Sequence, residues 1–123
     1  MEPGISTSTD VAVIEKLFPS LEGAEAIEME QLKYGGSDRP EVLPAPVDYN
    51  YRGYITLSEA AAEKYASAYS FTEMQPQVSF ASVKEREGQW TYSFDFSKEI
   101  IPAGYSGYIW MDGTTLLFDI GTM

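Results

Sequence analysis

The chain has 123 residues, 44% of them hydrophobic, and a formal net charge of −11 from 19 acidic and 8 basic residues. This length and hydrophobic content fit one domain with a core, and the charge argues against a nucleic-acid groove, because phosphates are bound mainly through Lys and Arg. The chain contains no cysteine and no histidine, which excludes disulfides, Ser–His and Cys–His nucleophiles and His-ligated metal sites within a single chain.

The ends of the chain carry little information about its compartment. We expect residues 1–8 to be a flexible lead-in and residues 9–123 to form a single globular α+β domain. No apolar run approaches the roughly 20 residues that a transmembrane helix needs. The sequence does not decide the localisation, but the polar, Ser/Thr-rich start favours an exported or lipid-anchored protein with its leader removed over a cytoplasmic one.

The first third predicts a short helix and a strand. Thr9 or Asp10 can cap a helix that ends before Pro19. Apolar and acidic residues alternate over 26–33, which favours a strand, although the spacing over 21–34 also fits a helix face. Residues 35–47 contain two glycines and three prolines and predict a long loop.

The middle of the chain predicts a strand over 49–56 followed by the main helix, at about 57–69. Thr56 and Glu59 match a capping box at its start. Leu57, Ala61 and Tyr65 form an apolar stripe, which we expect to pack on one face of a sheet.

The last third predicts an antiparallel meander. The pattern over residues 78–84 predicts an irregular strand. The aromatic residues at 90, 92, 94 and 96 alternate with polar ones, the clearest strand pattern in the chain. Asp112-Gly113 predicts a hairpin turn with Met111 opposite Thr114.

Together these elements predict an antiparallel sheet of about five or six strands, with one main helix on one face and a short N-terminal helix. Their order resembles small α+β folds such as the cystatin-like class, a likeness of fold that implies no function.

One cluster has the composition of a recognition surface. Such surfaces are rich in Tyr, Trp and Arg, because rigid amphipathic rings and a planar guanidinium supply contact energy. The candidate binding residues are Tyr49, Tyr51, Arg52 and Tyr54, with Tyr105, Tyr108 and Trp110 from the last hairpin. The alternative, that these tyrosines are half-buried strand residues, stays open.

The carboxylates offer a second candidate. Glu22, Glu25, Glu28 and Glu30 form an acidic patch, either a solvated face or an anionic docking surface. No acid has a partner at a spacing typical of a glycosidase pair or a calcium loop, so we expect no metal and no cofactor.

These observations favour a non-catalytic binding or accessory module. Its partner would be another protein or a cell-envelope or glycan component, with no direct nucleic-acid binding. Two alternatives are an acidic inhibitor that mimics nucleic acid and binds a basic protein, and a carboxylate-dependent glycan hydrolase.

Overall fold

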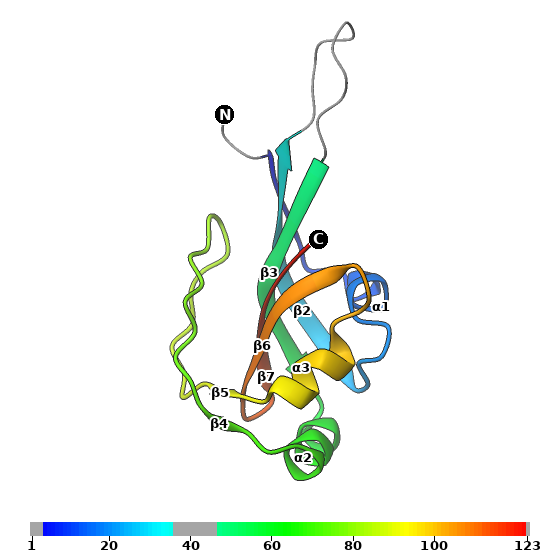
Figure 1. The fold of residues 1–123 in the computed structure, drawn as a ribbon, viewed down its shortest axis with the longest axis vertical. Coiled ribbons are helices and arrows are strands. Elements are labelled where there is room, and N and C mark those ends of the chain that lie inside the picture. Colours follow the sequence, from blue (N-terminus) through cyan, green and yellow to red (C-terminus); the bar gives the residue numbers. More distant parts are fainter. Residues whose placement is uncertain (1–3, 36–46, 123) are drawn as a thin grey trace, which may run out of the picture.

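The computed structural model describes residues 4–35 and 47–122, and in this part of the chain seven strands form one antiparallel sheet (Figure 1). The strands are β1 (Gly4–Ser8), β2 (Ala24–Gly35), β3 (Val47–Leu57), β4 (Thr72–Glu73), β5 (Thr91–Tyr92), β6 (Tyr105–Asp112) and β7 (Thr115–Thr122). The helices are α1 (Ala12–Leu17), α2 (Glu59–Ala68) and α3 (Phe94–Ile100). The fold is therefore α+β and mostly sheet.

The strand order is β1-β2-β3-β7-β6-β5-β4. The predicted strand over 26–33 is confirmed by β2, which pairs with β3 along its length, from Ala24↔Leu57 to Gly35↔Val47. Of the predicted loop over 35–47, residues 36–46 lie outside the described residues, while Gly35 belongs to β2 and Val47 to β3. The assignment of 9–123 to one domain stays a prediction. Within the described ranges no helix is long and apolar enough to cross a membrane.

Side chains of successive residues point to opposite faces of the sheet, and each face is covered by different segments. The helix face carries the larger cluster, with α1 and α3 on its side (Figure 1). Its buried strand residues are Ile27, Met29, Ile55, Leu57, Ile109, Met111, Leu116, Phe118 and Ile120.

The opposite face is covered by residues 74–90, which we call the strap. The strap has no regular secondary structure and runs along the side of the sheet away from α1 and α3 (Figure 1). On this strap face the strand residues Tyr54, Trp110 and Leu117 pack against Val83 and Trp90 of the strap. The predicted strand over 78–84 is therefore wrong, because these residues cover the sheet face instead of joining the sheet.

The main helix is shorter than predicted and differently capped. The Oγ of Ser58 accepts a hydrogen bond from Ala61 N at 3.2 Å, whereas Thr56 remains in β3, so the predicted capping box is wrong. Ala61 and Tyr65 are buried and join the helix-face cluster. The helix itself lies beyond the end of the sheet in Figure 1, and the expected packing on one face stays a prediction.

The predicted aromatic strand over 90–96 is confirmed only at Thr91–Tyr92, which form β5, and is wrong at Trp90 and beyond Tyr92. The Oγ of Ser93 accepts from Phe96 N at 3.2 Å and starts α3. This helix has an acid, Asp95, in its first turn and a base, Lys98, in its last, as helix polarity favours. The local cap therefore prevails over the two-residue alternation of the rings, and Phe94 ends up 65% exposed.

Two further expectations are corrected at the strand ends. Gly4–Ser8, expected in a flexible lead-in, form β1 and pair with β2; their side chains are mostly exposed, so no apolar alternation marks them. In the last hairpin the loop residues are Gly113 and Thr114, and Met111 pairs with Leu116. Gly113 has φ +59° and no non-glycine residue in the described part has a positive φ, so the glycine takes the first central position, as in a type II′ turn.

Phe96→Ala tests the helix-face core. Phe96 is fully buried, and the rings of Tyr65, Tyr69 and Phe71 lie 5.0 to 5.5 Å from it. Its loss should lower the free energy of unfolding by about 3–5 kcal/mol, measured by urea denaturation. Phe94→Ala on the same helix is the matched control and should stay within about 0.5 kcal/mol. Equal losses in the two variants would contradict this core assignment.

Candidate functional site

The predicted binding cluster is divided between the two faces of the sheet. Tyr51 and Tyr105 pack against the helix-face cluster, and Tyr49 stacks on Tyr51 at 6.1 Å. Arg52, Tyr54, Tyr108 and Trp110 belong to the strap face, because they alternate with the first group along β3 and β6. The seven residues therefore do not form one surface.

Two of the four residues on the strap face are buried. Tyr54 is 1% exposed and Trp110 is 3% exposed. The hydroxyl of Tyr54 accepts from Arg86 N at 2.7 Å, and the Arg86 guanidinium lies 4.7 Å from the centre of the Tyr54 ring. Tyr54 therefore holds the strap and is not available to a partner.

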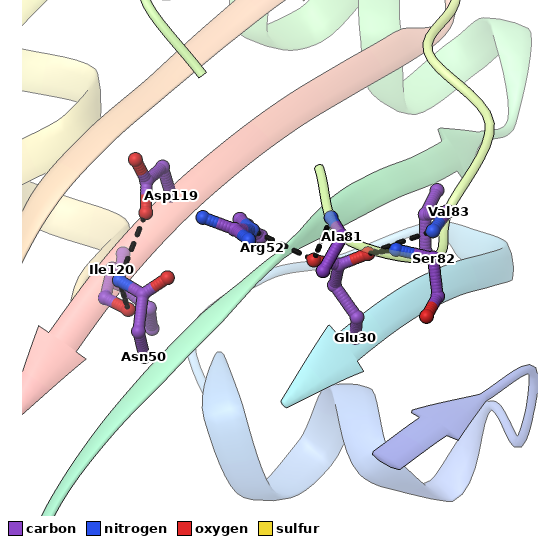
Figure 2. Close-up of polar contacts among 8 residues, drawn as sticks. All are labelled: Glu30, Asn50, Arg52, Ala81, Ser82, Val83, Asp119 and Ile120. Carbon is purple, nitrogen blue, oxygen red and sulfur yellow. Dashed lines mark hydrogen bonds and ion pairs between the residues drawn. The ribbon is translucent and has the colours of Figure 1, made fainter. Parts of the chain in front are cut away.

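Glu30 fastens the strap to the sheet (Figure 2). Its carboxylate is completely buried and accepts three strap backbone N–H groups, those of Ala81, Ser82 and Val83, each at 2.7 Å. A fourth donor, Nε of Arg52, lies 2.8 Å from Oε2 of Glu30. This arrangement satisfies a buried charge with charge-assisted hydrogen bonds, which are stronger than those between neutral groups.

The same contacts determine the ionisation of Glu30. Burial by itself would raise the pKa of the carboxyl, but the N–H groups of Val83, Ala81 and Ser82 and the Arg52 guanidinium outweigh it and lower the pKa from 4.5 to about 2. Glu30 is therefore ionised at neutral pH and already occupied by four donors.

The register of the sheet continues this polar row beyond Arg52. Glu30 pairs with Arg52, Arg52 with Asp119, and Asp119 with Tyr108. The Nδ2 of Asn50 donates to Oδ1 of Asp119 and to the carbonyl oxygen of Ile120, each at 3.0 Å. Arg52 lies between Glu30 and Asp119 in Figure 2, so three strands present a fixed set of polar groups to the strap face.

A cavity of about 340 Å³ opens where the far end of this row meets the start of the strap. We call it the strap groove; it is lined by Met74, Gln75, Gln77, Tyr108, Trp110 and Asp119. Tyr108 is 47% exposed, and its ring stacks on Trp110 at 5.5 Å with an angle of 22° between the planes. The Nε1 of Trp110 is buried without a hydrogen-bond partner in the described part of the chain. Buried unsatisfied donors are rare and call for an explanation, which a functional role can supply.

Sequence reasoning found only part of this groove. Of its lining residues, Tyr108 and Trp110 were among the candidate binding residues. Gln75 and Gln77 were missed, because they flank Pro76 in a segment without periodicity. The neighbours of Asp119 come from strand pairings that no local pattern shows.

The four glutamates of the predicted acidic patch have different surroundings. Glu30 is buried in the contacts described above. Glu22 is exposed and its Oε2 lies 2.9 Å from Nζ of Lys64. Glu25 is exposed and Glu28 is half-buried. Across the described ranges no group of three or more acidic residues is arranged to hold a metal ion.

Comparison of the chain with protein-family models, with curated proteins and with solved structures found no match. The function must therefore be inferred from the residues and their geometry.

Glu30→Gln tests the attachment of the strap. The amide has one acceptor oxygen and its NH₂ group is a donor, so buried N–H groups and the Arg52 charge lose their partner. We expect a loss of about 3–5 kcal/mol in the free energy of unfolding. Trypsin should also cleave faster after the strap residues Lys84 and Arg86. Glu28→Gln on the same strand and face is the control; a Glu30 variant as stable and protease-resistant as this control would contradict the assignment.

The pH dependence of stability gives a second test. Unfolded Glu30 takes up its proton near pH 4.5 and folded Glu30 near pH 2. Between these values the unfolded state binds more protons, so stability is complete above about pH 5 and falls as the pH is lowered. The Glu30 contribution amounts to about 3 kcal/mol. In urea denaturation series the difference between wild type and Glu30→Gln should shrink as the pH approaches 2; a difference constant from pH 7 to 2 would refute the assigned ionisation.

Proposed function

We propose that the protein is a non-catalytic binding or accessory module that recognises a carbohydrate of the cell envelope in the strap groove. The observation that carries the proposal is the half-exposed ring of Tyr108, stacked on buried Trp110 beside the polar side chains of Gln75, Gln77 and Asp119. A sugar has an apolar ring face and a rim of hydroxyl groups, and this groove offers a matching surface for each.

The polar groups suit hydroxyl recognition. Gln75 and Gln77 carry amides that both donate and accept, and the Asp119 carboxylate accepts. One Asp119 oxygen is held by Asn50, which leaves acceptor capacity for a ligand, since an ionised carboxylate has about four lone-pair sites. The volume of about 340 Å³ is within the range of small-ligand pockets.

The groove walls are held in place before a ligand arrives. Gln75 and Gln77 belong to the strap, which Glu30 and Tyr54 attach to the sheet. Trp110, Tyr108 and Asp119 lie on paired strands. Binding to a preformed groove spends less free energy on ordering side chains and loops.

Binding without catalysis agrees with the state of the acids. Glycoside hydrolysis needs two carboxyl groups about 5–10 Å apart, one of them able to donate a proton. Glu30 is buried, has a pKa of about 2 and is occupied by four donors, so it cannot serve as that acid. The alternative of a glycan hydrolase is supported by no second observation.

The nucleic-acid mimic has less support than the binding module. A mimic needs exposed, uncompensated negative charges. Of the four glutamates on which this alternative depends, Glu30 is buried and Glu22 is paired with Lys64.

Tyr108→Ala tests the proposed site. On a panel of immobilised cell-envelope oligosaccharides, including peptidoglycan fragments, glucans and mannans, the wild-type protein should bind at least one class. Tyr108→Ala should weaken that binding by about tenfold or more, as loss of a central aromatic contact does. Phe94→Ala, which removes another exposed ring, should leave it unchanged. Binding to none of these sugars, or equal binding by Tyr108→Ala, would refute the proposal.

A further inference from the structure

Strand β6 is paired over its full length along only one of its edges. Its inner edge pairs with β7 over its full length, from Tyr105↔Thr122 to Asp112↔Thr115. Its outer edge pairs with β5 at Trp110 and Met111 alone. The first half of β6 therefore has no neighbouring strand at its outer edge in the described part of the chain.

Side-chain contacts show which backbone groups point to that outer edge. Thr91 Oγ1 donates to the carbonyl oxygen of Met111 at 2.8 Å. The Oγ of Ser97 donates to the carbonyl oxygen of Ile109 at 3.2 Å and accepts from Ile109 N at 3.3 Å. In an antiparallel strand every second residue directs its N–H and C=O to the same edge. Gly107 and Tyr105 follow in that series.

Two residues thus offer backbone groups at the open edge. Tyr105 N donates to the carbonyl oxygen of Pro102 at 3.3 Å, which leaves its C=O. Gly107 offers both groups and has no side chain to cover them. Its φ is +152°, and a Cβ at this position would come within 2.0 Å of the Asp119 carbonyl oxygen, so only glycine fits. The backbone that approaches Gly107 closely is that of Asp119 and Ile120 in β7, so the inner pairing explains the glycine itself.

A second cavity, of about 470 Å³, lies along this edge. We call it the edge groove; it is lined by Tyr92, Phe94, Ser97, Lys98 and residues 101–107. Ile101, Pro102 and Ala103 are apolar, and the exposed Phe94 ring stands on the same helix as Ser97. An open strand edge beside an apolar groove is the arrangement that binds an extended peptide by adding it to the sheet.

The charge of the groove indicates what the peptide carries. Among the described residues that line the edge groove, Lys98 is the one that carries a charge. The ion pairs found among the described residues are Arg52–Glu30 and Lys64–Glu22, so Lys98 has no carboxylate partner in that part of the chain. A carboxylate on the peptide would complement it.

We infer that the edge groove docks an extended segment of another protein, which pairs with Tyr105 and Gly107, places apolar side chains against Phe94 and Ile101, and presents an Asp or Glu side chain to Lys98. This surface is separate from the strap groove, because Tyr108 and Asp119 do not line it. The inference therefore goes beyond the carbohydrate proposal and does not depend on it.

Peptide selection on the full chain tests the inference. A phage-displayed library of random linear peptides should yield binders in which one acidic residue lies among alternating apolar residues. Lys98→Glu should lower the affinity for the tightest-binding synthetic peptide by about tenfold or more, measured by calorimetry. Lys16→Glu is the matched control, since Lys16 is also an exposed lysine in the last turn of a short helix, and it should leave the affinity unchanged.

The backbone pairing is tested with the same peptide. N-methylation of alternate amides should abolish binding for one set of positions and spare the other, because only every second N–H of an added strand faces β6. The amide of Gly107 should gain protection from hydrogen exchange on binding. Equal effects of the two methylated sets, unchanged affinity of Lys98→Glu, or failure to select any peptide would overturn the inference. Loss of peptide binding in Tyr108→Ala with Lys98→Glu unaffected would overturn it too, and would assign the peptide to the strap groove.

Discussion

The buried carboxylate of Glu30 attaches the strap to the face of the sheet that the strap covers. Glu30 accepts three consecutive backbone N–H groups of the strap and the Nε of Arg52. A strap without regular structure leaves many of its backbone groups without strand or helix partners, and burying such groups unpaired is costly. Glu30 supplies these partners at one point, and Tyr54 supplies another through Arg86 N. These polar contacts and the packing of Val83 and Trp90 together hold the strap over the apolar residues of the strap face.

The two covered faces determine where a partner can bind. Tyr54 and Trp110 are of residue types that are common on recognition surfaces, but the strap buries both side chains. The two candidate binding grooves lie at the borders of the regions that are covered. The strap groove lies beside Tyr108, where the start of the strap meets β6 and β7. The edge groove lies where β5 ends and α3 leaves Gly107 uncovered. The position of each candidate site therefore depends on which parts of the sheet the strap and α3 cover.

Local sequence patterns predicted the elements that local physics decides. Alternation predicted β2, and the apolar stripe around Ala61 and Tyr65 predicted the main helix. The strap could not be predicted from local sequence patterns, because residues 78–84 are held by Glu30, about 50 positions earlier in the chain. Alternation also misled where a cap competed with it: Ser93 starts a helix inside the aromatic run. Four of the seven residues of the predicted binding cluster lie on the strap face, and Gln75 and Gln77 of the strap groove carried no sequence signal.

The central claim, that ionised Glu30 holds the strap on the sheet, is tested most directly by NMR. The amide proton shifts of Ala81, Ser82 and Val83 would be followed from pH 7 to about pH 1, so that the titration passes through the pKa of Glu30. Because all three N–H groups donate to one carboxylate, the account predicts that they move together, with a common midpoint near pH 2 as Glu30 is protonated. Separate midpoints, a common midpoint near 4.5, or shifts that do not respond to pH would contradict it.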